Sequence, residues 1–101
     1  MTLTEIKERY PDRVPVYVQK KENSNVPDVP KHKYLVPKCM TMGNFIYIIR
    51  KNIKLTSDKA LFVFVDNKLV CNTESMEEVY KKYQNEDGFL YTVYSSESTF
   101  G

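Results

Sequence analysis

The chain has 101 residues and a mass of 11.9 kDa, which is enough for one ordinary domain and excludes a multidomain enzyme. With 42% hydrophobic and 28% charged residues it can bury a core, so a disordered tail is excluded as well. The net charge of +2 is uneven: residues 1–54 hold 11 Lys and Arg against 5 Asp and Glu, and residues 55–101 hold 4 against 8. A basic first half suits nucleic acid, an anionic membrane surface or an acidic peptide.

The first half predicts a short helix followed by two strands. We expect the helix over Thr2–Arg9 and the first strand over Val14–Lys20, where valines alternate with other residues. Segment 22–30 is rich in Asn, Pro and Ser and is expected to be a loop. The second strand is expected over Lys33–Lys38, and its Pro37 is best tolerated at a sheet edge or a strand end.

The middle of the chain predicts an amphipathic helix and a buried strand. Thr41 occupies an N-cap position, and the apolar residues that follow have the spacing of one helical face: Phe45, Ile48, Ile49 and Ile53. Leu61–Val65 is apolar throughout, which indicates a strand that is buried on both faces.

The last third predicts a short returning strand, a helix and a final strand. The short strand is expected at Leu69–Val70, after a polar turn. Ser75 and Glu78 have the spacing of a capping box, which begins a helix. The final strand is expected over Phe89–Tyr94, so that residues 1–94 form the domain and residues 95–101 a flexible polar tail.

This order of elements favours an α+β chain with the β-grasp, or ubiquitin-like, architecture. A hairpin, a long crossing helix and a late strand that returns to the sheet centre fit a central parallel pair, which requires such a crossover. The pattern alone leaves a ferredoxin-like sheet open as the alternative.

The sequence offers little for catalysis or metal binding. His32 is the single histidine, and Cys39 and Cys71 lack the spacing of a zinc site, so we expect no metal, no cofactor and no enzyme activity. Both cysteines are expected to be reduced and buried. The longest apolar run, Ala60–Val65, is far short of the about 20 residues of a membrane-spanning helix. The N-terminus has no secretory signal, so we expect a cytoplasmic protein.

The basic cluster Lys31-His32-Lys33 allows two interpretations. It is either a solvated turn that leads into a core strand, or the rim of an edge strand that can accept an extended peptide. In the second case the lysines would favour acidic peptides.

Several motifs together resemble the GABARAP family of autophagy ubiquitin-like modifiers. They occur in family order over nearly the whole chain: Tyr10-Pro-Asp-Arg-Val-Pro-Val16, Lys33-Tyr-Leu-Val-Pro37, Met42–Lys51, Ala60–Val65 and Glu86–Gly101. The resemblance implies the β-grasp fold rather than the ferredoxin-like one.

The resemblance also implies a protein that is conjugated through its terminal glycine, here Gly101, to phosphatidylethanolamine on autophagic membranes. The implied partners are activating and conjugating enzymes, a processing and delipidating cysteine protease, and cargo receptors with short linear motifs. No nucleic-acid partner is implied, and the lipidated form is expected on the autophagosomal membrane. A C-terminal glycine fits this chemistry because it can thread a narrow enzyme tunnel.

The resemblance implies two peptide-binding pockets, whose residues are identified by matching positions of this sequence to the family's motifs. The residues that match the pocket for an aromatic anchor are Ile6, Pro15, Lys31, Lys33, Leu35 and Phe89. The residues that match the pocket for an aliphatic anchor are Tyr34, Val36, Pro37, Met40, Phe45 and Ile48. Arg13 adds positive charge nearby.

The chain departs from the family pattern at three places. Only the latter part of the second of two N-terminal helices matches, and Cys71-Asn72-Thr73 replaces a turn that is commonly proline-rich. Asn52 stands where the family usually has a basic residue that assists acidic peptides. A non-conjugated β-grasp module for peptides and a nucleic-acid-binding protein remain as the alternative functions.

The replacement at Asn52 predicts that peptide binding responds weakly to salt. One acidic peptide titrated between about 0.05 and about 0.5 M ionic strength should lose less affinity with this chain than with a relative that has the basic residue, because one screened attraction is absent. An equal or steeper salt dependence would reject the prediction.

Overall fold

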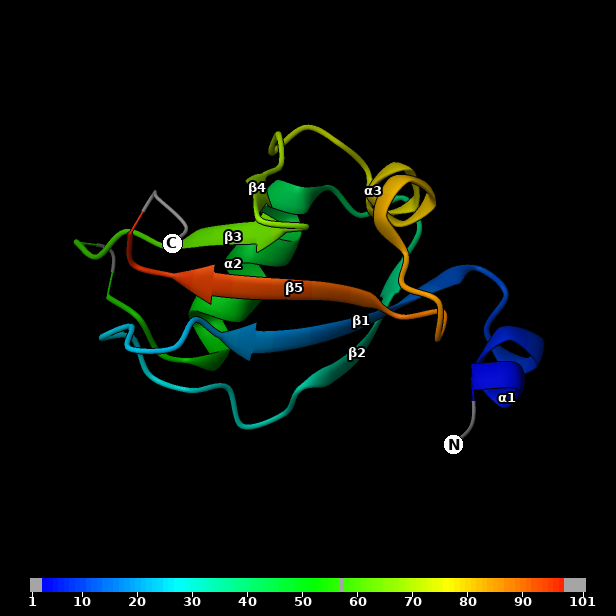
Figure 1. Ribbon diagram of the computed structural model, residues 1–101, viewed down its shortest axis with the longest axis horizontal. Helices are drawn as coiled ribbons and strands as arrows, with labels where there is room; N and C mark the ends of the chain where they lie inside the picture. The colour runs from blue at the N-terminus through cyan, green and yellow to red at the C-terminus, as the bar shows by residue number, and fades with distance from the viewer. Residues whose placement is uncertain (1–2, 57, 98–101) are drawn as a thin grey trace.

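The computed structural model describes residues 3–56 and 58–97 and shows one five-stranded mixed sheet with three helices (Figure 1). The sheet order is β2-β1-β5-β3-β4, in which β1 and β5 are parallel and the other neighbours antiparallel. The elements are α1 (Leu3–Arg9), β1 (Arg13–Lys20), β2 (Lys33–Pro37), α2 (Met42–Asn52), β3 (Phe62–Val65), β4 (Lys68–Leu69), α3 (Met76–Tyr83) and β5 (Leu90–Ser95).

This topology confirms the β-grasp prediction. β1 and β2 are antiparallel neighbours joined by a loop, whereas a ferredoxin-like sheet places a helix between its first two strands. All predicted elements are present, with bounds that shift by one or two residues. None of the helices in the described part of the chain has the length and apolar character to cross a membrane.

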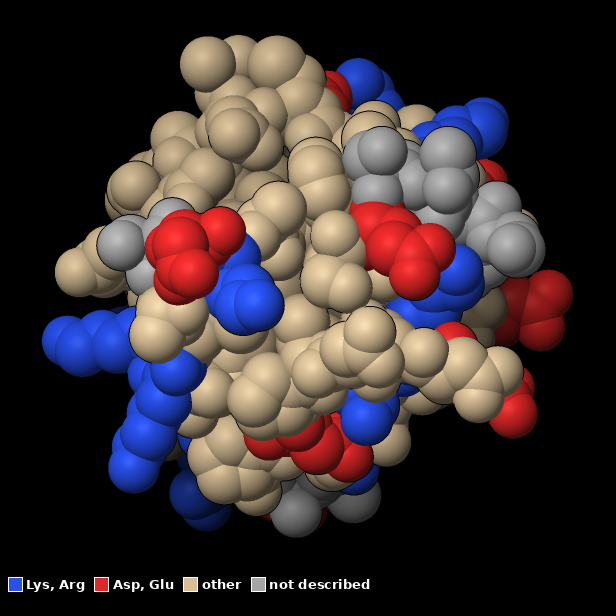
Figure 2. All heavy atoms as spheres, turned by 90° about the vertical axis from the view of Figure 1, so that its left-hand side faces the viewer, with Lys and Arg blue, Asp and Glu red and all other residues tan. Residues whose placement is uncertain are grey.

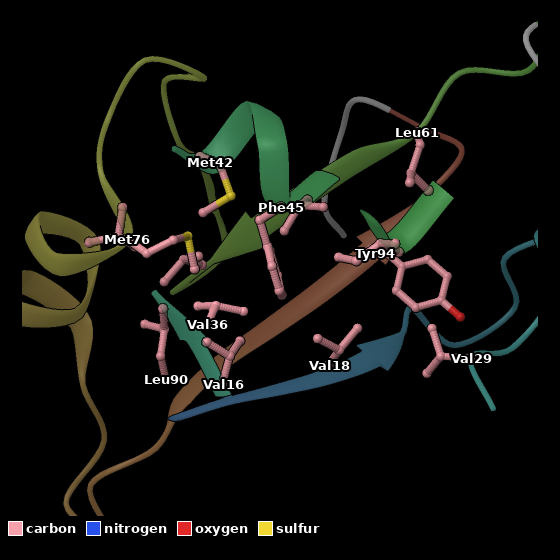
Figure 3. Packing of buried hydrophobic residues seen from close by; sticks show 14 of the residues in the cluster. Val16, Val18, Val29, Val36, Met42, Phe45, Leu61, Met76, Leu90 and Tyr94 are labelled. Atoms are coloured by element: carbon pink, nitrogen blue, oxygen red, sulfur yellow. The ribbon is translucent and has the colours of Figure 1, made fainter. Parts of the chain in front are cut away.

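Helix α2 covers one face of the sheet and supplies the centre of the core. Thr41 caps the helix as predicted, since its hydroxyl accepts a hydrogen bond from the Asn44 amide at 3.2 Å. Met42, Phe45 and Ile49 are fully buried against the strands. Figure 3 shows the Phe45 ring pointing from α2 into the layer of valines on β1.

Tyr94 on β5 ties the long loop 21–32 to the core. Its side chain is fully buried, and its hydroxyl donates a hydrogen bond to the Pro27 carbonyl at 2.8 Å. Val26 and Val29 from the same loop are also buried in the core cluster, and Val29 lies beside the Tyr94 ring in Figure 3. The loop therefore has a defined path despite its polar sequence.

Three details differ from the sequence-based expectations. Cys39 and Cys71 are free and exposed, so the prediction of burial was wrong: both lie in loops, outside the strands and helices that bury side chains. β5 extends through Ser95, one residue into the predicted tail, because Ser95 pairs with Phe62 of β3. Residues 98–101 of the predicted tail, which include Gly101, lie outside the described residues.

The buried Tyr94 makes the fold sensitive to alkali. Burial, together with the nearby Asp28 carboxylate, raises the pKa of Tyr94 to about 12. In the unfolded chain a tyrosine loses its proton near pH ~10, so deprotonation favours unfolding and stability should fall as the pH rises from about 10 to about 12. The urea midpoint should therefore fall less between about pH 8 and about pH 11 for Tyr94→Phe than for the wild type.

Tyr47→Phe is the matched control, because Tyr47 is 64% exposed. This variant should show the same fall of the urea midpoint between the two pH values as the wild type. If the urea midpoint of Tyr94→Phe falls as much as that of the wild type, Tyr94 is not the cause of the loss of stability in alkali.

Candidate functional site

β2 is an edge strand, and the register shows which of its backbone groups face outward. The Val18 amide donates to the His32 carbonyl at 2.7 Å, and the Lys38 amide donates to the Asp12 carbonyl at 3.1 Å. Because hydrogen-bonded and non-bonded pairs alternate in an antiparallel ladder, Tyr34 and Val36 bond to β1. The backbone N–H and C=O groups of Lys33 and Leu35 therefore point to the open side.

Pro37 ends this open edge. It occupies an outward-facing position, where its missing N–H costs no ladder bond, and its carbonyl accepts a hydrogen bond from the Met40 amide at 3.1 Å. The edge that an extended peptide could use thus spans residues 33–35, which agrees with the predicted edge strand.

A cavity of about 440 Å³ lies beside this edge and gathers five of the six residues predicted for the aromatic-anchor pocket. Its walls come from α1, from the start of β2 and from the residue that precedes β5: Ile6, Lys31, Lys33, Tyr34, Leu35 and Phe89. Ile6 is itself buried, so α1 closes one side of the cavity.

Pro15 and Arg13 do not line this cavity. Both line a smaller hollow of about 230 Å³ at the start of β1, together with Lys7, Tyr10 and Tyr80 among others. Pro15 is the cross-strand neighbour of Leu35, but its buried ring faces the other hollow. Arg13 pairs with Pro37 and so lies toward the end of the open edge.

Two lysines place positive charge on the aromatic walls. The Lys31 ammonium lies 5.4 Å from the centre of the Tyr34 ring, and the Lys33 ammonium lies 5.6 Å from the centre of the Phe89 ring. Each such contact contributes about 0.5 to 1 kcal/mol at an exposed site. The cavity is therefore apolar inside and basic at its rim.

A turn holds Phe89 in the cavity wall. Asp87 accepts hydrogen bonds from the Phe89 amide at 3.0 Å and from the Tyr91 hydroxyl at 2.5 Å. The hydrogen bond from the Tyr91 hydroxyl lowers the pKa of the Asp87 carboxyl, because it stabilises the charged form. The Tyr80 hydroxyl donates to the Gly88 carbonyl at 2.6 Å and fixes the same turn to α3.

Four of the six residues predicted for the aliphatic-anchor pocket lie in the core or pack against it. Val36 and Phe45 are buried in the core cluster, with no more than 4% of either exposed, and Tyr34 and Met40 pack against that cluster. Tyr34 meets the Phe45 ring edge-on, with ring centres 6.1 Å apart. Pro37 and Ile48 are half-buried.

One contact was missed by the sequence analysis. The Asn52 side-chain amide donates a hydrogen bond to the Tyr34 hydroxyl oxygen at 3.0 Å, which joins the end of α2 to β2. The available signal was the helical spacing, since Asn52 lies one turn beyond Ile48 and therefore on the same face of α2.

The described residues give no support for a catalytic or metal centre. His32 binds the Val18 carbonyl through Nδ1 at 2.8 Å and stacks on Tyr17, which places it in the surface of the sheet. No group of three metal-ligating side chains occurs in the ranges that the structure describes. The Thr73 hydroxyl lowers the pKa of the exposed Cys71 thiol, but a hydroxyl is not a general base that could activate it.

Comparison with known proteins places this geometry in a family. A family described as "Autophagy protein Atg8 ubiquitin like" matches residues 2–101. Autophagy-related protein 8e of Arabidopsis thaliana is 56% identical over 95% of this chain and 79% of its own length. Autophagy-related protein 8 of Mycosarcoma maydis is 48% identical over 95% of this chain and 81% of its own length.

Two solved structures share the fold and much of the sequence. Trypanosoma brucei ATG8 superposes with a TM-score of 0.88 at 40% identity, covering 97% of this chain and 84% of that one. Plasmodium falciparum Atg8 in complex with a Plasmodium falciparum Atg3 peptide gives a TM-score of 0.87 at 34% identity, covering 96% and 86%.

The position of Ile6 predicts that it anchors α1. A helix of seven residues is too short to be stable alone, so it depends on this packing. Ile6→Ala should lower the free energy of unfolding by about 2 kcal/mol, the low end for a buried isoleucine, and should abolish hydrogen-exchange protection in α1 while β1 and β5 stay protected. Lys7→Ala, at an exposed neighbour, is the control. Retained protection in α1 of the Ile6 variant would contradict the prediction.

Proposed function

Because the chain belongs to the Atg8 family and is a ubiquitin-like modifier of autophagy, we propose that it is joined through Gly101 to phosphatidylethanolamine and binds cargo peptides along the β2 edge. Within the family we assign it to the GABARAP branch, on the motifs named from the sequence. The observation that carries the proposal is the family match through residue 101 together with an open edge strand beside an apolar cavity.

The conjugation half of the proposal rests on the family match, which includes Gly101. β5 ends at Ser95, at the end of the sheet opposite α1 (Figure 1). In the proposed sequence the Gly101 carboxylate reacts with ATP to form an acyl adenylate, and pyrophosphate leaves. An enzyme thiol then displaces AMP to form a thioester, and the lipid amine displaces the thiol to form the amide. Activating and conjugating enzymes catalyse these steps, and a cysteine protease hydrolyses the amide with water. The chain itself acts as the tag and not as an enzyme.

The binding half of the proposal uses the edge and the cavity together. A peptide strand would hydrogen-bond to the outward backbone groups of Lys33 and Leu35, and an aromatic anchor would enter the cavity beside Phe89. An aliphatic anchor would lie on the surface above Phe45. The Plasmodium falciparum Atg8 structure contains an Atg3 peptide, and we extend that type of partner, a segment of the conjugating enzyme, to this chain. In the cell we place the free protein in the cytoplasm and the lipidated form on the autophagosomal membrane.

Nucleic-acid binding is the less favoured function. The Phe45 ring is fully buried and the half-buried Tyr34 ring packs edge-on against it, so neither ring presents an open stacking platform. On the face where β1 and β5 end, acidic and basic side chains are intermixed (Figure 2). A backbone-binding surface needs a continuous basic stripe, which this face does not show.

Replacement of Gly101 tests the conjugation half directly. Gly101→Ala should abolish, or lower at least about tenfold, the amount of lipid conjugate in a reconstituted reaction with activating enzyme, conjugating enzyme and phosphatidylethanolamine vesicles, because the added methyl group obstructs close passage of the terminus through the enzymes. Ser98→Ala is the matched control in the same segment. Undiminished conjugation of the Gly101 variant would count decisively against the proposal.

Peptide binding separates this function from a non-conjugated binding module. Leu35→Ala should weaken peptide binding about tenfold, since it removes a cavity wall, and should leave conjugation measurable. If Gly101→Ala conjugates normally while Leu35→Ala still weakens peptide binding, the chain is the non-conjugated module instead.

A further inference from the structure

The smaller hollow at the start of β1 lies past the end of the open β2 edge. Its volume is about 230 Å³, and its walls come from α1, from the start of β1 and the corner before it, from the residue after β2 and from α3: Lys7, Tyr10, Pro11, Arg13, Pro15, Lys38 and Tyr80. Four of these residues carry tyrosine or proline rings, and the other three are basic. Among the residues that the structure describes, no acidic one lines the hollow. It therefore combines apolar walls with cations.

Backbone hydrogen bonds join the segments around the hollow. The Arg13 amide donates to the Tyr10 carbonyl at 3.1 Å, which sets the corner between α1 and β1. The Lys38 amide donates to the Asp12 carbonyl at 3.1 Å, and the Lys38 carbonyl accepts from the Glu77 amide of α3 at 3.2 Å. The hollow is thus formed before a ligand arrives, so little ordering is required on binding.

The cations of this hollow are largely unneutralised. Within the described part of the chain, neither Lys7 nor Arg13 has an ion-pair partner. Lys38 makes a long ion pair with Glu77 at 3.9 Å, and an exposed pair of this kind contributes little. Because the ring walls keep part of the surrounding water away, these cations attract an anion in the hollow more strongly than they would on an open surface.

A phosphoryl group matches this arrangement better than a carboxylate does. It carries about −1.5 to −2 charges at pH 7 and has three acceptor oxygens. The Arg13 guanidinium can donate two parallel hydrogen bonds to such a group, and each lysine adds a point charge. A carboxylate has one charge and two oxygens, so it satisfies fewer of these donors, and a neutral side chain gains no charge attraction.

The hollow adjoins the proposed peptide-binding edge. Pro15 in its wall is the cross-strand neighbour of Leu35, and Arg13 is the neighbour of Pro37, where the open edge ends. Helix α1 contributes a wall both to the cavity beside β2 and to this hollow. An extended chain advances about 3.3 Å per residue, so a peptide that is anchored in the cavity and follows β2 past Pro37 arrives at the hollow within about five residues.

Resting on the peptide-binding function proposed above, we infer that this hollow binds an anionic side chain of the partner peptide, above all a phosphorylated serine or threonine that lies past the open edge. Phosphorylation of a partner then strengthens its binding without a change in either anchor residue. Lys31 and Lys33 line the other cavity, so they are not part of this site.

Synthetic phosphopeptides test this inference. Each parent peptide carries one tryptophan and one leucine at varied spacing in a background of serine and glycine, and the tightest binder is extended by about six residues at either end. One serine at a time is then phosphorylated or replaced by Glu. Calorimetry compares the wild-type chain with Lys7→Gln, Arg13→Gln and Lys38→Gln. Lys68→Gln is the matched control, because Lys68 is exposed on β4 at the opposite edge of the sheet.

The readout is the ratio of the affinities of the modified and the parent peptide. In the wild type, phosphorylation at one or two adjacent positions past an anchor should tighten binding at least about tenfold, and Glu at the same position about threefold. Each of the three Gln substitutions in the hollow should lower the phosphoserine ratio at least about threefold, because one of its cations is removed. Lys68→Gln should keep the full ratio.

The absence of any such gain would overturn the inference while the peptide-binding function stands. So would a gain that is equal at every position or that survives all three substitutions in the hollow, since it would reflect general attraction to a basic surface. If no parent peptide binds the wild type, the binding half of the proposed function fails and this inference fails with it.

Discussion

The parallel pairing of β1 with β5 in the middle of the sheet is the constraint on which the other features depend. Parallel neighbours need a long crossover, which α2 supplies while it covers the inner face. The late strand takes the centre, so β2 is left at an edge with outward backbone groups. The approach to β5 also brings Phe89 next to Lys33, and α1 adds Ile6, which completes a cavity from segments far apart in sequence.

The same burial that stabilises the fold supports the candidate binding surface. Val36 and Phe45 belong to the core, and the half-buried Tyr34 and Met40 pack against it. A close-packed core resists rearrangement, so the surface keeps its shape before a partner arrives and less ordering is needed on binding. The end of β5, which precedes the proposed conjugation segment, lies at the opposite end of the sheet from α1.

Polar groups lie directly on the aromatic residues beside the β2 edge. The Lys31 and Lys33 ammonium groups lie over the Tyr34 and Phe89 rings, and the Asn52 amide binds the Tyr34 hydroxyl. Charged groups steer partners and reject wrong ones, whereas paired neutral groups read hydrogen-bond patterns at short range. In the proposed peptide-binding function, the two lysines would favour acidic residues of a partner peptide.

The sequence by itself determined the elements and the caps, because periodicity, Thr41, Ser75 and the prolines act over a few residues. The order of the elements left two sheet topologies open, and the family resemblance of the motifs favoured the β-grasp. Its motifs also identified most of the cavity. Only the tertiary structure decided that Pro15 faces a separate hollow, that Cys39 and Cys71 are exposed, and that Asn52 reaches Tyr34. These outcomes depend on the twist of the sheet and on the approach of α2 to β2, which set distances between residues that no local pattern of the chain encodes.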